Sequence, residues 1–184
     1  MAVFTGIASA SERLQKMMQE ALVPNLVASA GRIALCSPSD EEDVALGIFL
    51  YDIQEYVHMR SHTMIDLPDG SQMKPPMYLT LYYMITAYAA GDLRFRTTQE
   101  ERILGRVIQY FYDHPVFELG GEKIQVQMEP ISTEDKLKLW SFPNVSYKTS
   151  VYYKISPVPV ESEIVNAVDK VTEVKMRVRG WKKN

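Results

Sequence analysis

The chain has 184 residues, of which 46% are apolar and 23% charged, and its formal net charge is −3. This length and composition fit one folded domain and exclude a disordered or fibrous chain. A slightly acidic chain offers no basic field that would attract a polyanion, so nucleic acid is not an expected partner.

The cysteine count and the hydropathy pattern indicate a compartment. Cys36 is the only cysteine, which excludes an intrachain disulfide framework and a zinc site built from paired cysteines, and fits a reducing environment. No stretch approaches the roughly 20 apolar residues of a membrane-spanning helix, and the first residues lack the pattern of a secretory signal. We therefore expect a cytoplasmic protein without a membrane anchor.

The first helix is predicted from a capping-box spacing at Ser9 and Glu12, followed by apolar residues on one face from Leu14 to Leu22 and a stop near Pro24. Four further segments follow. They are predicted to be a short strand, a solvated acidic turn, a long strand and an extended loop, at residues 32–36, 40–43, 44–56 and 57–76.

The strongest strand pattern covers residues 77–88, where apolar residues on one face alternate with an aromatic but amphipathic second face. A second capping box, at Thr98 and Glu101, predicts a helix that ends at His114-Pro115. Two strands, 116–119 and 122–128, then flank Gly120-Gly121, which predicts a hairpin because a primed turn needs positive φ at both central positions.

The last third of the chain predicts a short helix starting at residues 132–135 and a strand over 145–155, which ends before Pro157-Val-Pro159. Apolar residues then recur at helical spacing from Ile164 to Val171, and residues 173–179 alternate as in a strand. The fold class is α/β in the broad sense, or α+β: a mixed, largely antiparallel sheet with its helices on one side.

No pattern typical of an active site stands out, and we expect no catalytic, cofactor-binding or metal-binding residues. Ser71 and Lys74 have the spacing of a serine–lysine pair, but Pro75-Pro76 prevents the helix that such a pair requires. His58 and His62 lie in the predicted loop, where local hydrogen bonding is the simpler interpretation. His114 suits the end of a helix, and the acidic run 40–43 lacks the spacing of a calcium loop.

Two groups of residues, the tyrosines and the apolar residues of the tail, predict protein interfaces. The chain has eleven tyrosines, a residue that tolerates a half-buried contact with its hydroxyl in water, and we select Tyr78, Tyr82 and Tyr88. Ordinary core and surface roles for these tyrosines stay open. The alternating tail places Val174, Met176 and Val178 on one face, which suits strand addition to a neighbouring subunit or an edge strand of its own sheet.

Several blocks of sequence, in order, resemble the cap or tail-terminator family of extracellular contractile injection systems, which includes the cap subunits of antifeeding-prophage-like and virulence-cassette-like particles. The blocks are Leu50-Tyr51, Lys74 to Tyr88, Glu101 to Arg106, Asp113 to Pro115, Met128 to Leu137, Leu139-Trp140, Tyr147 to Tyr153, and Pro157-Val158.

The resemblance implies a structural protein with a tail-terminator-like fold over residues 1–160, followed by a C-terminal arm, 161–184. It implies a six-fold ring of identical subunits that ends tube and sheath growth, with the tape-measure protein as a further candidate partner. Such a protein would assemble in the cytoplasm and then join the particle.

Three alternatives to the cap stay open. The first is a neck, adaptor or baseplate subunit of such a particle. The second is a small hydrolase that uses Asp113 with His114, or Ser71 with Lys74. The third is a connector that contacts nucleic acid through the basic end of the chain, at Arg177, Arg179, Lys182 and Lys183.

Overall fold

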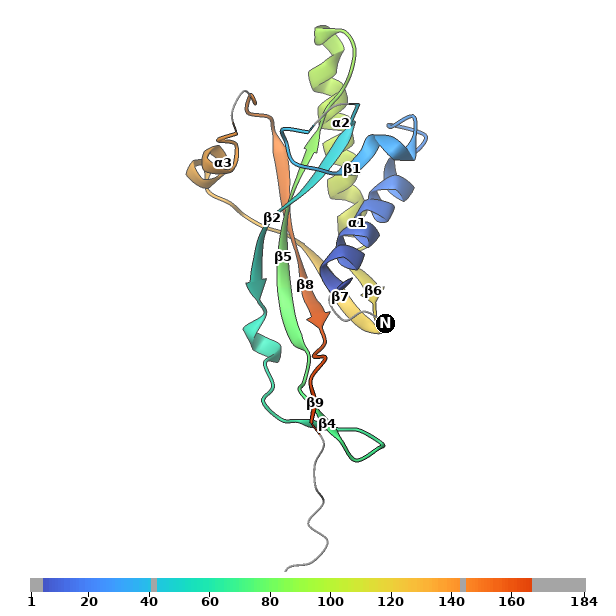
Figure 1. Ribbon diagram of the computed structural model, residues 1–184. Coiled ribbons are helices and arrows are strands. Elements are labelled where there is room, and N and C mark those ends of the chain that lie inside the picture. The colour runs from blue at the N-terminus through green and yellow to red at the C-terminus, as the bar shows by residue number, and fades with distance from the viewer. Residues whose placement is uncertain (1–4, 41–42, 143–144, 167–184) are drawn as a thin grey trace, which may run out of the picture.

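A six-stranded sheet runs through the computed structural model, which describes residues 5–40, 43–142 and 145–166 (Figure 1). Its strand order is β1-β2-β5-β8-β7-β6; β1 and β2 are parallel and all other neighbours are antiparallel. The predicted fold class, a mixed and largely antiparallel sheet with flanking helices, is therefore confirmed. The strands are β1 Ile33–Leu35, β2 Leu46–Glu55, β5 Met77–Ala87, β6 Val116–Leu119, β7 Glu122–Met128 and β8 Ser150–Val160.

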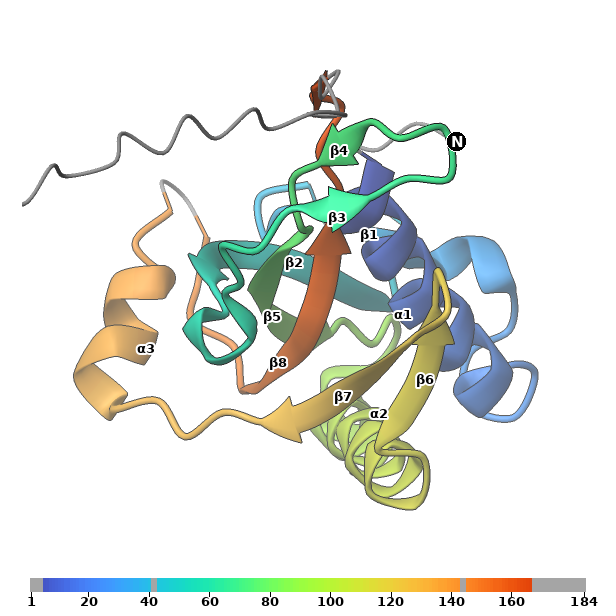
Figure 2. The ribbon, with the colours of Figure 1, turned by 90° about the horizontal axis from the view of Figure 1, so that it is seen from below.

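Two long helices, α1 (Gly6–Leu22) and α2 (Leu93–Asp113), pack on one face of this sheet (Figures 1 and 2). The core between them is continuous and apolar, because α1 and α2 each present one apolar stripe to the alternate residues of β5. Its central members are fully or almost fully buried, namely Leu14, Met18, Leu22, Leu81, Tyr83, Ile85, Ile103, Val107, Phe111, Ile124 and Ile155.

Both long helices begin earlier than predicted. α1 is preceded by Thr5, so Ser9 lies inside it, and α2 is preceded by Asp92, whose side chain accepts a hydrogen bond from the Arg94 amide at 3.1 Å. The capping-box predictions were wrong because the same spacing also occurs inside helices, and no glycine or proline lies between Asp92 and Thr98 to stop the helix from extending.

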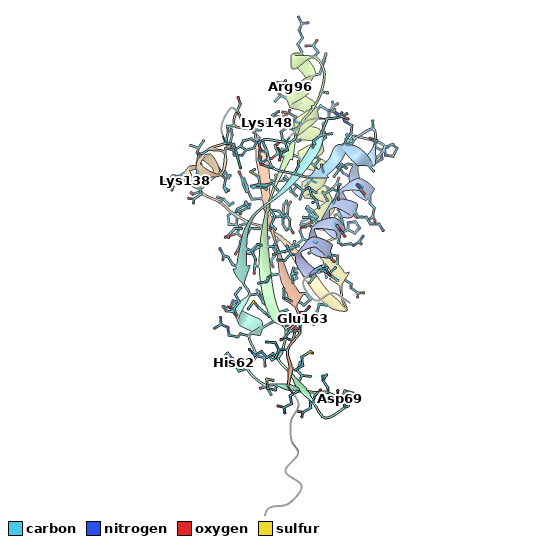
Figure 3. All side chains as sticks on the ribbon, in the orientation of Figure 1. His62, Asp69, Arg96, Lys138, Lys148 and Glu163 are labelled. Atoms are coloured by element: carbon cyan, nitrogen blue, oxygen red, sulfur yellow. The ribbon has the colours of Figure 1, made fainter. Side chains whose placement is uncertain are left out.

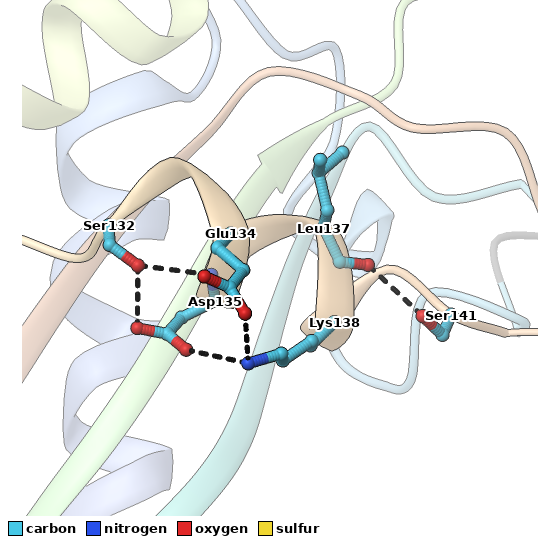
Figure 4. A network of polar contacts seen from close by, with 6 residues as sticks. All are labelled: Ser132, Glu134, Asp135, Leu137, Lys138 and Ser141. Carbon is cyan, nitrogen blue, oxygen red and sulfur yellow. Dashed lines mark hydrogen bonds and ion pairs between the residues drawn. The ribbon is translucent and has the colours of Figure 1, made fainter.

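The third helix, α3 (Thr133–Leu139), lies on the opposite side of the sheet (Figure 1). The prediction of all helices on one side was therefore wrong for α3. Its predicted start is confirmed: Ser132 accepts a hydrogen bond from the Asp135 amide at 3.1 Å. Figure 4 shows this start, where the Ser132 hydroxyl bonds Asp135 and Lys138 pairs with Glu134 and Asp135.

The β6–β7 hairpin has the predicted bounds, and Gly120 and Gly121 have φ angles of +61° and +88°, as a primed turn requires. The last long strand differs from its prediction. β8 begins at Ser150 and continues through Pro157 and Pro159 instead of ending before them. Proline is tolerated there because β7 pairs no further than Ser156, which leaves β8 a neighbour on one side only.

Beyond the sheet, residues 57–76 form a narrow extension (Figure 1). Most of it is irregular, as predicted, but it also contains the short helix η3 (Val57–Met59) and strands β3 (Ile65–Asp66) and β4 (Gln72–Met73). β4 also pairs with β9 (Val165–Asn166), so the helix predicted from the spacing of Ile164 was wrong there. The rest of the predicted tail, 167–184, lies outside the described residues.

Candidate interaction surfaces

The three selected tyrosines lie far apart and differ in exposure: Tyr78 and Tyr82 are in β5, and Tyr88 directly follows its last residue. Tyr78 and Tyr82 are half-buried, and their hydroxyls donate at 3.2 Å to Glu122 and Gln54, respectively. Tyr88 is only 7% exposed, with the Lys148 ammonium 5.2 Å from its ring centre. The structure therefore does not bring the three together, and their role as interface residues stays a prediction.

The three apolar tail residues, Val174, Met176 and Val178, lie outside the described residues. The segment that precedes them is placed, because β9 holds Val165 and Asn166 against β4 at the far end of the extension (Figure 1). Any contact made by the tail therefore starts from that end of the molecule.

The described residues cover only part of the sheet face opposite α1 and α2. Near α3, Met84, Trp140 and Tyr152 form a small buried cluster. Further along, this face presents amides, hydroxyls and one ammonium group around an open groove of about 360 Å³. We call this region the polar sheet face, and it consists of Gln54, Thr80, Tyr82, Gln125, Gln127, Lys154 and Ser156.

Charges at the border of the polar sheet face are paired. Lys154 lies 2.9 Å from Glu129, and this hydrogen bond raises the pKa of the lysine. The neighbouring Tyr51 ring lies 6.1 Å, centre to centre, from both Tyr82 and Tyr152. Its burial and the nearby Glu129 carboxylate raise its pKa well above the usual value, so the hydroxyl stays neutral at physiological pH. The face can therefore offer hydrogen bonds without a strong net charge.

A second hollow, of about 280 Å³, lies where the extension leaves the sheet. Arg60 donates two hydrogen bonds to the Glu55 carboxylate, which lowers the pKa of Glu55. His62 and Lys74 also line this hollow, together with the rings of Tyr56 and Tyr78. Its surface is mixed, with apolar proline and methionine side chains between the charged groups.

The candidates for catalysis and metal binding are not assembled into a site. Ser71 donates to Asp69 at 2.5 Å and precedes strand β4, so it does not start the helix that a serine–lysine pair would need. His58 is exposed and packs against Tyr56. Within the described parts of the chain, no three His, Cys, Asp or Glu side chains cluster as a metal site would require.

His114 has the predicted position at the end of a helix. It follows the last residue of α2, its Nδ1 lies 3.1 Å from the Tyr110 carbonyl oxygen, and its ring stacks on that of Tyr110. Figure 3 places His62 and Asp69 on the extension, whereas Lys138 and Lys148 lie toward the other end of the sheet. In residues 5–40, 43–142 and 145–166, no helix has the length and apolar character to cross a bilayer.

The family follows from a comparison with known proteins. A family model described as the Pvc16 N-terminal domain matches residues 9–173. The chain belongs to this family. The predicted resemblance to cap and terminator subunits is thereby confirmed. No curated protein matches this Pvc16 N-terminal domain chain.

Two solved structures share the fold of this Pvc16 N-terminal domain. One is the sheath/tube terminator of the extracellular contractile injection system PVC in its extended state, with a TM-score of 0.71, 20% identity, and coverage of 96% of this chain and 64% of that one. The other is the anti-feeding prophage cap, a tube terminating cap, with a TM-score of 0.65, 17% identity, and coverage of 92% and 60%. The chain thus spans less than two thirds of either relative.

Two features of these surfaces escaped the sequence analysis. The polar sheet face was missed, although the alternation of Gln125 and Gln127 with buried Ile124 and Val126 in β7 is a signal for it. The docking of α3 by Trp140 was also missed. It depends on Met84 and Tyr152, which no local pattern links to Trp140.

Proposed function

We propose that this protein is a tail terminator, or cap, of a contractile phage-tail-like injection particle. In this role it forms a ring of six identical copies that ends the growth of tube and sheath. The observation that carries the proposal is the shared fold with a sheath/tube terminator over 96% of the chain. The match to the Pvc16 N-terminal domain over residues 9–173 supports it.

The surfaces suit this role on physical grounds. A terminator must bind the previous layer of the tail through one of its faces. Its other face must not present the surface to which a next layer would bind. A closed ring can meet both conditions, whereas an open polymer repeats the same contact without end. The half-covered sheet and the extension offer contact surfaces, and the function needs neither a reaction nor a cofactor. The proposed partners are further copies of the chain, inner-tube and sheath subunits, and the tape-measure protein.

The proposal also keeps the two-part organisation expected from the sequence. Residues 1–160 form the terminator domain and 161–184 the C-terminal arm, because the six-stranded sheet ends with Val160. Tyr78, Tyr82 and Tyr88 are proposed contacts of the domain, and Val174, Met176 and Val178 of the arm. Assembly takes place in the cytoplasm, and the finished ring stays on the particle.

The test is to assemble tube and sheath with and without the protein. We expect its omission to give tails of uncontrolled length, and a gold label on the protein to appear by electron microscopy at the end opposite the spike. Native mass spectrometry of the ring should give six copies. A label at the spike end would instead support a baseplate subunit, and a persistent monomer that leaves tail length unchanged would refute the cap.

A further inference from the structure

The extension has no apolar core of its own. Residues 57–76 are described throughout, and none of their side chains is buried or belongs to either apolar cluster. The strands β3, β4 and β9 are only two residues long, and Val57, Met59 and Ile65 are exposed. A small sheet without a buried apolar face is marginally stable by itself. Contact with a partner would bury these side chains and stabilise the extension.

The hollow at the root of the extension has rigid, largely apolar walls. Its apolar lining residues are Tyr56, Met64, Pro75, Pro76, Met77 and Tyr78. The prolines have fixed φ angles and no amide donor, and the Tyr56 amide donates to the Tyr78 carbonyl oxygen at 2.7 Å. The volume, about 280 Å³, lies just below the range of roughly 300–1,000 Å³ typical of small-molecule sites, so the hollow suits a few partner side chains better than a cofactor.

Cationic groups outnumber carboxylates around this hollow. Arg60, His62 and Lys74 line it, and Glu55 is the one carboxylate among its lining residues. Glu55 is occupied by Arg60, which donates from Nε and Nη2. That pair fixes the guanidinium and leaves Nη1 for another acceptor. Lys74 is exposed and has no ion pair within residues 5–40, 43–142 and 145–166.

We propose that the hollow takes up a segment of a tube or sheath subunit in which a carboxylate lies next to an apolar side chain. The carboxylate accepts from Lys74 and from Nη1 of Arg60, and the apolar side chain enters between the tyrosine and proline walls. Charge-assisted hydrogen bonds are strong, and the apolar side chain excludes water from them. This inference rests on the proposed cap function, because it assigns one contact of the cap with the tail.

The preference for an acidic partner belongs to the hollow and not to the whole extension. Asp66 and Asp69, which accept hydrogen bonds from Gln72 and Ser71, are carboxylates of the β3–β4 hairpin and do not line the hollow. Glu161 follows Val160, the partner of Met77, and does not line it either. The last residues of the chain, 167–184, have six Lys and Arg against two Asp and Glu. Their composition is therefore the opposite of what the hollow favours.

Photo-crosslinking in assembled particles locates the partner. The photoreactive p-benzoylphenylalanine replaces Met77, which lines the hollow and is 52% exposed. We expect a crosslink, mapped by mass spectrometry, to a tube or sheath segment with Asp or Glu next to an apolar residue. The matched control is the same replacement at Met128, also 52% exposed but in β7, and it should not reach that segment. No crosslink from position 77, or one to this chain, to a second copy or to a segment without a carboxylate, would refute the docking.

A charge exchange tests the contact itself. Lys74→Glu should weaken binding to uncapped tails in co-sedimentation by at least about tenfold, because two carboxylates then face each other. Lys16→Glu, at an exposed position of α1, is the control and should bind normally, and circular dichroism checks that both variants fold. Replacing the crosslinked carboxylate of the partner by lysine should restore binding of Lys74→Glu.

The docking and the cap function can fail separately. Normal binding of Lys74→Glu, or no restoration by the partner's lysine, would refute docking in the hollow. Tail length without the protein judges the cap: unchanged length refutes the cap function, whereas uncontrolled length together with normal binding of Lys74→Glu refutes only the docking.

Discussion

The sheet face beneath α1 and α2 is sealed, whereas the part of the chain that the structure describes covers the opposite face only in part. On the sealed side Leu81, Tyr83 and Ile85 of β5 are fully buried. On the other side Met84 of the same strand is buried under Trp140, while Tyr82, two residues earlier, reaches solvent through a groove. One strand thus serves both faces, because its side chains alternate.

The two faces of the sheet therefore suit different purposes: the sealed face suits stability, and the other face suits contact with a partner. The sealed face holds the continuous apolar core, which supplies most of the favourable free energy of folding. The open face carries amides, hydroxyls and paired charges, which can form hydrogen bonds with a partner at little cost to the fold. Substitutions on the two faces should therefore have different consequences, and the following expectations test that contrast.

The largest loss of stability is expected from a cavity on the sealed face. Leu14→Ala, at a fully buried position in α1, should lower the free energy of unfolding by about 2–5 kcal/mol. Urea unfolding followed by circular dichroism measures this. Leu137→Ala, at a 55% exposed position in α3, is the control and should stay within about 0.5 kcal/mol of the original. Equal losses in both variants would contradict the contrast.

Alkaline pH should also act on the sealed face. Burial raises the pKa of Tyr83 from 10.0 to about 12, although a hydrogen bond with Ser11 lowers it slightly. The pKa of Tyr83 is higher in the folded chain than in the unfolded chain. The contribution of its neutral, buried hydroxyl to the free energy of unfolding is therefore fully present below pH 10 and is lost as the pH rises toward 12. The loss amounts to roughly 2–3 kcal/mol.

The measurement is the free energy of unfolding between pH 9 and 12 in urea. Tyr83→Phe should flatten this dependence, although Tyr153, whose pKa burial also raises to about 12, still contributes. Tyr112→Phe, at an 84% exposed position, should leave the dependence unchanged. If Tyr83→Phe and Tyr112→Phe gave the same pH profile as the original chain, the burial of the Tyr83 hydroxyl would not govern alkaline stability.

An intermediate effect is expected where α3 covers part of the second face. Trp140→Ala removes the main apolar contact of α3, a helix of seven residues that has no buried residue of its own. Because α3 has no buried residue of its own to hold it once Trp140 is removed, we expect it to detach from the sheet, which would limit the loss to about 1–3 kcal/mol and confine fast amide exchange to residues 133–139. Fast exchange spread through β5 and β8 would show instead that the cluster supports the whole sheet.

The sequence was sufficient for the parts of the fold that local patterns determine. The alternation in β5 separates Leu81 and Ile85 from Tyr82, and the paired glycines place the β6–β7 turn. Ser132 marks the start of α3 because its hydroxyl accepts from an amide three residues later. The family resemblance supplied the role, which no local pattern contains.

The remaining features depend on contacts between distant residues. β8 passes through Pro157 because β7 stops pairing at Ser156. Tyr88 is buried because Gly47 leaves room for its ring, which would lie 3.1 Å from an added Cβ. Likewise, within residues 5–40, 43–142 and 145–166, β2 has no outer neighbour beyond Ile48, because β1 is three residues long and ends opposite that residue. None of these relations has a signal within one segment.

The smallest effect on stability, and the sharpest test of the contrast, is expected at Tyr82. Its hydroxyl bonds the exposed Gln54 side chain and its ring borders the polar sheet face, so Tyr82→Ala should change the free energy of unfolding by less than about 1 kcal/mol. If this face contacts other subunits, the same variant should weaken ring formation or attachment to tube and sheath, because a large aromatic contact is lost. Sedimentation and tail-length measurements test this, with Tyr112→Ala on α2 as the control. A Tyr82→Ala ring that forms and caps normally would assign the polar sheet face to solvent.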